Sequence, residues 1–178
     1  MLRSPSNIVL IGMPGCGKST VGVILAKILS RGFTDTDLLI QTEQGRSLQN
    51  IVDTDGYLVL REIEEQVLLG LSVRNQVIAT GGSAAYSHAA MSHLGHDGII
   101  VFLHADLVTL RARVKDYSSR GLAKRPEQTL DDLFDERLSL YMEYADITID
   151  CCRFSHDEVC SRILAGLDSI PPRCHRHP

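Results

Sequence analysis

The fold of this chain is decided by residues 12–20, whose sequence is Gly12-Met13-Pro14-Gly15-Cys16-Gly17-Lys18-Ser19-Thr20. The first eight residues fit the pattern G-x-x-x-x-G-K-[ST], whose glycines let backbone N–H groups point at phosphate oxygens. The apolar run at 7–11 predicts a buried parallel strand before this loop, and the apolar spacing within 19–30 predicts a helix after it. Because a helix N-terminus adds partial positive charge, this order of elements predicts a nucleoside triphosphate site.

The residue types in the loop predict individual roles. The Lys18 ammonium would reach the β- and γ-phosphates, and the Ser19 hydroxyl would ligate Mg²⁺. Backbone N–H groups of the loop would hold the remaining phosphate oxygens. The predicted ATP-binding residues of the loop are Gly12, Gly15, Cys16, Gly17, Lys18, Ser19 and Thr20.

Length and charge limit the classes of protein to consider. The chain has 178 residues and a formal net charge of -4, which argues against general binding to nucleic acid or an anionic membrane. It contains no apolar signal core and no run of membrane-spanning length. We therefore expect one domain over 1–170, a disordered tail at 171–178, and a monomeric cytoplasmic protein with reduced thiols.

Strands and helices are predicted to alternate along the chain. The predicted strands are 7–11, 32–37, 76–80, 98–103 and 147–150. The predicted helices are 19–30, 56–73, 84–94, 106–117, 130–145 and 156–168, with two short helices on either side of Gly45. This alternation indicates a three-layer α/β sandwich, with a five-stranded parallel sheet covered by helices on both faces. Ligands of such sheets bind at the carboxyl ends of the strands.

Two carboxylates, Asp35 and Asp37, end the predicted strand at 32–37. One could support Mg²⁺ through water while the other accepts a proton from a substrate hydroxyl. The alternative is structural, because Asp is a favoured N-cap and a helix is expected to start near Leu38. Beside a phosphate-binding loop, the functional interpretation is the stronger one.

Arginines are the second group of candidates. Arg61 lies three residues before Glu64 on the predicted helix at 56–73, a spacing that allows an ion pair to hold the guanidinium. A fixed guanidinium binds a carboxylate through two hydrogen bonds, although a solvated surface pair has the same spacing. The segment 118–129 contains Arg120 and is predicted to be a surface loop able to act as a lid.

Histidines and cysteines supply no metal motif. The histidines at 88, 93, 96 and 104 do not share a helical face. Cys151, Cys152, His156 and Cys160 could suggest zinc, but thiols at a strand end and on a helix commonly pack in a core.

Taken in order, the motifs resemble those of the shikimate kinases, a branch of the small P-loop kinases. The matching segments are GMPGCGKST at 12–20, DTD at 35–37, LREIEE at 60–65, TGGS at 80–83, RGL at 120–122, ERLSLY at 136–141 and ITID at 147–150. The resemblance implies a P-loop kinase fold with a lid. It also implies phosphorylation of a shikimate hydroxyl by ATP with Mg²⁺, giving 3-phosphoshikimate and ADP.

The resemblance also implies roles for single residues. Asp37 would lie beside the attacking hydroxyl and Asp35 would organise Mg²⁺ through water. Arg120 would close over both substrates, and Arg113 would sit near the adenine with Phe154 as a loosely matched neighbour. The residues implied to bind the acceptor are Asp37, Arg61, Gly81, Gly82 and Arg137. The residues implied to be catalytic are Lys18, Asp37 and Arg120.

Four positions depart from the family pattern. Ser83 replaces a third glycine, Leu60 replaces an aromatic residue, and the lid reads Arg120-Gly121-Leu122-Ala123 where the family has Arg-Pro-Leu-Leu. Ser83 could crowd the acceptor or add a hydrogen bond. Two alternatives therefore stay open: a kinase of another hydroxy acid such as gluconate, and an ATP-binding module without catalysis.

Overall fold

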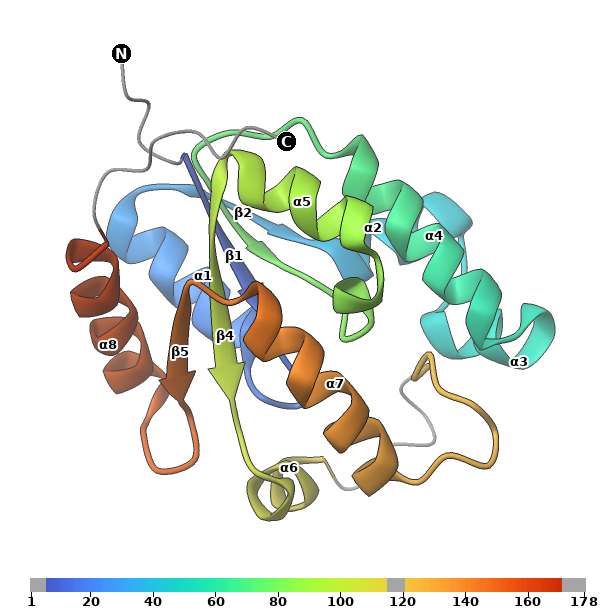
Figure 1. The fold of residues 1–178 in the computed structure, drawn as a ribbon. Coiled ribbons are helices and arrows are strands. Elements are labelled where there is room, and N and C mark those ends of the chain that lie inside the picture. The colour runs from blue at the N-terminus through green and yellow to red at the C-terminus, as the bar shows by residue number, and fades with distance from the viewer. Residues whose placement is uncertain (1–5, 115–120, 171–178) are drawn as a thin grey trace.

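The computed structural model describes residues 6–114 and 121–170. At its centre is a parallel sheet of five strands in the order β2-β3-β1-β4-β5 (Figure 1). The strands are β1 (Asn7–Ile11), β2 (Gly32–Asp35), β3 (Gln76–Ala79), β4 (Gly98–His104) and β5 (Ile147–Asp150). The predicted fold class is thus confirmed.

Helices cover both faces of this sheet. They are α1 (Lys18–Leu29), α2 (Thr36–Gln44), α3 (Leu48–Asp55), α4 (Tyr57–Gly70), α5 (His88–His96), α6 (Leu107–Arg113), α7 (Leu130–Tyr144) and α8 (His156–Asp168), with a 3-10 turn at Ala84–Tyr86. Helices α1 and α8 pack together on one face, and α5 and α7 pack on the other (Figure 1). In the part of the chain that the structure describes, no helix is long and apolar enough to cross a membrane.

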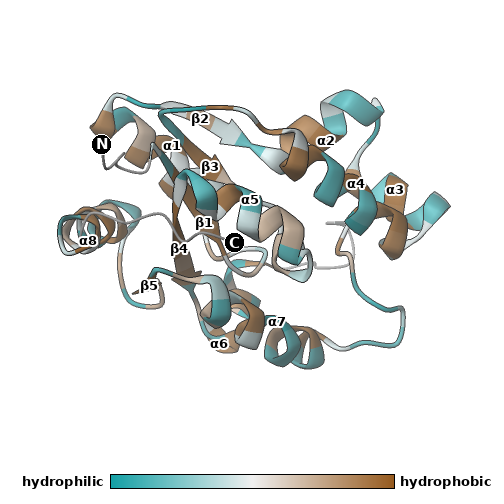
Figure 2. Ribbon diagram, turned by 45° about the horizontal axis from the view of Figure 1, so that its top comes forward, coloured by the Kyte–Doolittle hydropathy of each residue, from teal (hydrophilic) through white to brown (hydrophobic). Residues whose placement is uncertain are grey.

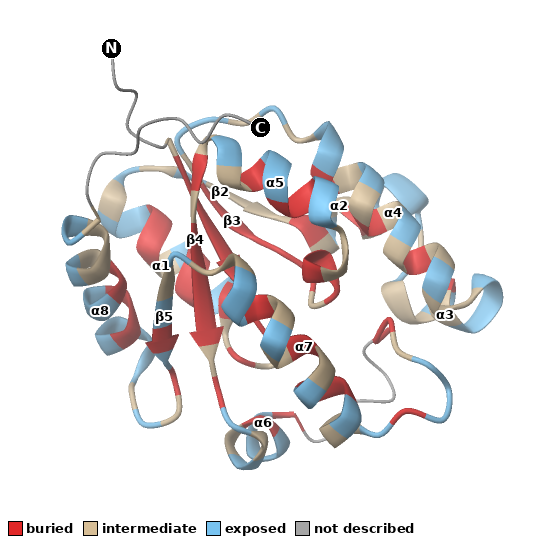
Figure 3. Cartoon of the chain, in the orientation of Figure 1, coloured by how far each residue is buried: buried red, intermediate tan, exposed pale blue. Residues whose placement is uncertain are grey.

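The central strands form the core because their residues are apolar on both sides. Every residue of β1 is buried, whereas β2 at the sheet edge is only partly buried (Figure 3). Figure 2 shows the same difference as hydropathy, with apolar colour concentrated on the central strands and on the inner faces of the helices. A parallel sheet that is covered on both faces requires this near-continuous apolar composition.

Several predicted boundaries need correction. Strand β2 ends at Asp35, and the Asp35 side chain accepts hydrogen bonds from the backbone N–H groups of Asp37 and Leu38 as the N-cap of α2. Asp37 therefore lies in the first helical turn and not in a strand. The segment predicted as one helix at 84–94 is a 3-10 turn followed by α5, because the Ser87 side chain caps a new helix.

The segment predicted as a surface loop at 118–129 is not all on the surface. Within its described part, Leu122, Ala123 and Gln128 are buried. Ala123 packs with Ile40 of α2 and Leu60 of α4 in a small second apolar cluster, apart from the main core. This cluster attaches the segment to the helices beyond β2.

Candidate active site

The phosphate-binding loop has the geometry that its glycines predict. Gly15 and Gly17 have φ values of 87° and 108°, in the left-handed region that favours glycine, and Gly17 is the N-cap of α1. The Lys18 Nζ donates to the carbonyls of Gly12 and Met13 at 2.7 Å and 3.1 Å. The ammonium is thus held against the loop, at the N-terminal end of the helix where an anion is favoured.

Two side-chain oxygens able to ligate a metal ion meet beside this loop. The Ser19 Oγ donates to Asp35 Oδ2 at 2.6 Å, while Asp35 Oδ1 caps α2. The capping alternative is therefore correct for Asp35, but it leaves the other carboxylate oxygen directed at Ser19. Hydroxyl and carboxylate oxygens are ligands that Mg²⁺ prefers, so the pair fits that ion.

A cavity of about 660 Å³ joins the loop to the ends of β2 and β3. The predicted site residues that line it are Gly15, Gly17, Lys18, Ser19, Thr20, Asp37, Gly82, Arg113 and Arg137. Burial raises the pKa of Asp37, the Asp35 charge adds to this, and the Lys18 and Arg137 charges oppose it. The cavity therefore places a carboxylate of raised basicity close to two cations.

Arg137 and Arg61 converge on one acceptor, the carbonyl oxygen of Ala123. Arg137 is 1% exposed and donates to it through Nη2 at 3.0 Å, and Arg61 donates through Nε at 3.3 Å and Nη2 at 3.0 Å. The Arg61 guanidinium also lies 3.6 Å from the centroid of the Tyr86 ring. No ion pair joins Arg61 to Glu64 in the described chain, so that prediction is wrong.

Arg61 lies outside the main cavity. It lines a neighbouring cavity of about 320 Å³, and the wall between the two is shared by Glu64 and Ser83. Glu64 is 4% exposed, and its Oε2 accepts a hydrogen bond from the Ser83 hydroxyl. Burial and the Asp37 charge raise the pKa of Glu64 to about 7, against the opposing effects of Ser83, Arg137 and Lys18.

The two glycines after β3 allow close approach of these groups. A methyl group on Gly81 would lie 2.2 Å from Glu64 Oε1 and 2.6 Å from Asp37 Oδ1. A methyl group on Gly82 would lie 2.7 Å from Arg137 Nη1. The Tyr141 hydroxyl of α7 donates to the Gly82 carbonyl at 2.5 Å and fixes this turn.

The chain contacts α3 at Gly121, where the described residues resume. The Gly121 N–H donates to Gln49 Oε1 at 2.6 Å, and Gly121 has a φ of 60°. A methyl group on Gly121 would lie 2.4 Å from backbone atoms of Leu48 and Gln49. This close approach gives a reason for glycine at this position. Arg120 lies outside the described residues, as does the tail at 171–178, so the predictions made for them stay predictions.

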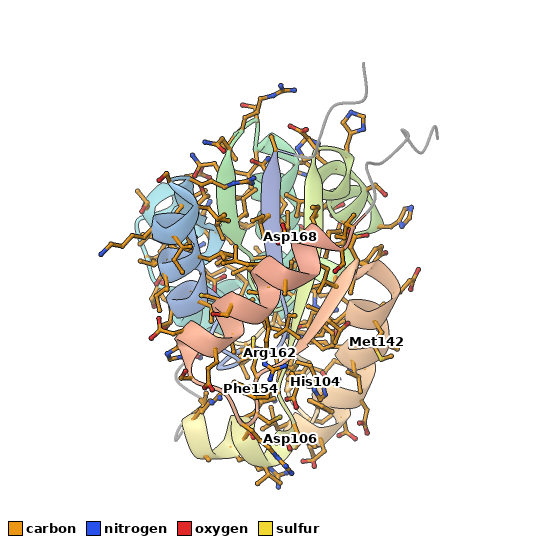
Figure 4. The ribbon with its side chains drawn as sticks, turned by 90° about the vertical axis from the view of Figure 1, so that its left-hand side faces the viewer. His104, Asp106, Met142, Phe154, Arg162 and Asp168 are labelled. Carbon is orange, nitrogen blue, oxygen red and sulfur yellow. The ribbon has the colours of Figure 1, made fainter. Side chains whose placement is uncertain are left out.

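Arg113 ends α6 beside the phosphate-binding loop. Its Nη1 donates to the Cys16 carbonyl at 3.3 Å and its Nη2 to the Cys151 carbonyl at 2.6 Å. Phe154 does not line the cavity. Its ring lies 3.6 Å from the Arg162 guanidinium of α8, and Figure 4 shows the two side chains together. The neighbour that does line the cavity is His156.

A group of potential metal ligands lies away from this cavity. The ligand atoms of His104, Asp150 and Cys152 lie within 4.8 Å of one another at the ends of β4 and β5; Figure 4 labels His104. Asp150 accepts from the Cys152 N–H at 2.9 Å, and Cys152 Sγ accepts from the Asp106 N–H at 3.3 Å. Hydrogen bonds within the two loops account for this arrangement. Among the described residues no such group includes His156.

The sequence analysis missed Glu64 as a residue of the cavity. The signal was present, because Leu60, Glu64 and Leu68 follow one another at the four-residue spacing of one helix face. A glutamate between two leucines on an inward face indicates a buried carboxylate. The Ala123 carbonyl, to which Arg61 and Arg137 both donate, had no such signal, because every residue has a backbone carbonyl.

Comparison with known proteins assigns the family. A sequence model described as shikimate kinase matches residues 14–168. The chain is 36% identical over 170 residues to a shikimate kinase from Pseudomonas paraeruginosa, covering 94% of this chain and 99% of the relative. The chain belongs to the shikimate kinase family.

Solved structures of shikimate kinases have the same fold as this family member. The enzyme from Acinetobacter baumannii, solved in complex with shikimate, is 34% identical with a TM-score of 0.85, covering 92% of this chain and 93% of its own. The enzyme from Aquifex aeolicus is 34% identical with a TM-score of 0.78, covering 91% and 96%. A gluconokinase from Sinorhizobium meliloti, at 20% identity and a TM-score of 0.50, shares the fold alone.

Proposed function

We propose that this shikimate kinase family member transfers the γ-phosphoryl group of ATP to a hydroxyl of shikimate, giving 3-phosphoshikimate and ADP. The observation that carries the proposal is the single cavity that brings together the phosphate-binding loop, Asp37 and Arg137. It offers one set of groups for a triphosphate and another for a carboxylated polyol. A nucleotide-sensing module would need only the first set.

The donor half of the reaction uses the loop and α1. Backbone N–H groups at Gly15 and Gly17 bind phosphate oxygens, and the Lys18 ammonium turns from the Gly12 and Met13 carbonyls to the β- and γ-phosphates. Ser19 would hold Mg²⁺ and Asp35 would support it through water, which fits the adjacent oxygens of the two side chains. Mg²⁺, when bound, neutralises charge on the β- and γ-phosphates.

The acceptor half uses the end of β3 and the buried face of α7. Arg137 binds the substrate carboxylate with its remaining donors, and Arg61 supports it from the neighbouring cavity by holding the same Ala123 carbonyl. Gly81 and Gly82 let the ring approach the backbone. In this assignment Arg61 acts on the acceptor through the segment that contains Ala123.

Asp37 orients the attacking hydroxyl and accepts its proton. A bond forms between the hydroxyl oxygen and the γ-phosphorus while the bond from that phosphorus to the β–γ bridging oxygen breaks, and ADP leaves with the bond's electrons. The raised pKa of Asp37 favours proton acceptance as the hydroxyl becomes acidic. Lys18 and Arg120 neutralise the transferring group, with Arg120 supplied by the lid at 118–129.

Other parts of the proposal concern the whole protein. We assign one domain to residues 1–170 and expect a monomer that acts in the cytoplasm without nucleic acid or membrane. Sedimentation analysis with and without substrates tests the monomer, and a dimer that persists at low concentration would refute it.

Acceptor-dependent release of ADP tests the proposed function. The purified protein with ATP and Mg²⁺ should release ADP rapidly when shikimate is added, and only at background rate with gluconate or without an acceptor. Binding of ATP is measured separately by calorimetry. If ATP binds but shikimate does not stimulate ADP release, the proposal fails. Stimulation by gluconate alone would indicate the alternative hydroxy acid kinase.

A further inference from the structure

Ser83 supplies a hydroxyl to the wall of the main cavity. Ser83 is 7% exposed and lines the main cavity, and its hydroxyl donates to Glu64 Oε2. Among the described residues, this is the only hydrogen bond that the Glu64 carboxyl receives. A side chain without a hydroxyl at this position could not make this bond.

The second oxygen of Glu64 lies close to the Asp37 carboxylate. Glu64 Oε1 is buried without a hydrogen-bond partner in the described chain, although Glu64 lines the cavity. It lies against Gly81 on the same side as Asp37 Oδ1, as the short distances from a methyl group built on Gly81 show. A buried carboxylate oxygen without a donor lacks stabilisation that a ligand hydroxyl can supply.

The charge state of Glu64 depends on several neighbours. The charged and titratable groups whose fields reach it are Asp37 of α2, Lys18 of α1, and Arg137 and Tyr141 of α7. Burial and the Asp37 charge favour the neutral carboxyl. The ionised form is favoured by the Ser83 hydrogen bond and by the positive charges of Arg137 and Lys18. Because the pKa of Glu64 is raised to about 7, its charge changes near neutral pH.

We propose that Ser83 is a positioning residue for acceptor recognition: its hydrogen bond favours the ionised form of Glu64 and leaves Oε1 to accept a hydrogen bond from an acceptor hydroxyl. This rests on the proposed function, because the ligand is the polyol that the kinase phosphorylates. An ionised carboxylate with one oxygen bound by Ser83 offers the other to the ligand in a fixed direction. A neutral carboxyl places a proton on one oxygen and weakens this acceptor.

The proposal predicts a shift in the pH dependence of acceptor binding. A hydrogen bond to a charged group is strong enough to move the pKa of its acceptor by about one to two units. Without the Ser83 hydroxyl, the pH at which shikimate affinity reaches half its plateau should rise by about one to two units. Affinity well above that pH should stay within a few-fold of the original protein.

Calorimetric titration with shikimate from pH 6 to pH 9 tests this for the original protein, Ser83→Ala and Ser83→Gly. The matched control is Ser87→Ala, since Ser87 donates to Glu65 at 2.7 Å outside the main cavity and should leave the pH midpoint unchanged. Glu64→Gln should remove the dependence of shikimate affinity on pH between pH 6 and pH 9. An unchanged midpoint in both Ser83 variants overturns the proposal.

A second measurement separates this proposal from the proposed function. The carboxyl carbon of Glu64 is titrated by ¹³C NMR without any acceptor, with its resonance assigned by its absence in Glu64→Gln. An upward shift of its pKa in Ser83→Ala supports the coupling even if shikimate is not the acceptor. An unshifted pKa overturns the coupling even if shikimate is phosphorylated.

Discussion

Replacing Gly82 by alanine should damage acceptor binding while leaving the fold intact. The new methyl carbon would lie 2.7 Å from Arg137 Nη1 and 2.9 Å from the Cγ and Cδ atoms of Pro14. Gly82 has no positive φ, so alanine can adopt its backbone conformation without strain. The effect of the substitution is therefore steric, and the new methyl group would press on Pro14 of the phosphate-binding loop and on Arg137.

The structure sets the size of this effect. Arg137 is 1% exposed and Pro14 has a rigid ring, so the overlap is relieved only by moving one of them. Adding a methyl group to such a packed site costs about 1–3 kcal/mol. If Arg137 moves, it loses a charge-assisted hydrogen bond to the substrate worth about 1.5–3 kcal/mol, and KM for shikimate rises by about 10- to 150-fold. KM for ATP should change less, unless the loop moves instead.

Steady-state kinetics with each substrate, together with thermal unfolding, measure these changes. The control is Gly95→Ala in α5, where the nearest atom to the new methyl carbon is 3.5 Å away. That substitution should leave both KM values unchanged and stabilise the helix by at most about 1 kcal/mol. If Gly82→Ala keeps the original KM for both substrates, the close approach of Gly82 to Arg137 and Pro14 is refuted.

Three further substitutions test other parts of the site. Asp37→Asn should lower kcat by at least about 100-fold with ATP affinity kept, because it removes the proton acceptor; calorimetric loss of ATP binding would contradict the assignment. Arg137→Ala should raise KM for shikimate by about 10- to 100-fold, since it removes a charge-assisted pair, and an unchanged KM would refute the carboxylate site. Glu64→Gln should flatten the pH dependence of stability, measured by urea unfolding at pH 5 and pH 8. The pKa of Glu64 in the folded protein is raised to about 7, so the protonated carboxyl stabilises the fold at low pH. This contribution to the free energy of unfolding, about 3 kcal/mol, is lost as pH rises through 7. Equal pH dependence in the two proteins would contradict the burial of this carboxyl.

The sheet was predictable because its strands have a strong and local signal. Residues 8–11 of β1 are all apolar, and the glycines of 12–17 have no other common use in that context. The last helix was predicted at 156–168 and has the bounds His156–Asp168, and the structure shows a capping box formed by Ser155 and Glu158 at its start. These features depend on neighbours in sequence.

The cavity wall was harder to predict because it depends on contacts distant in sequence. Ser83 and Glu64 meet across 19 positions, and Arg61 reaches the Ala123 carbonyl across 62. The helical spacing of Arg61 and Glu64 allowed an ion pair, but Tyr86 supplies a competing aromatic surface for the guanidinium. Spacing on one helix identifies possible partners, and tertiary packing chooses among them.

The central claim is transfer of phosphate to a shikimate hydroxyl, and ³¹P NMR of the reaction mixture tests it most directly. With ATP, Mg²⁺ and shikimate, one new phosphomonoester resonance should grow in equal amount to ADP. Its coupling should locate the phosphate on the 3-hydroxyl. ADP accompanied only by inorganic phosphate, or no loss of ATP while both substrates bind, would contradict the account.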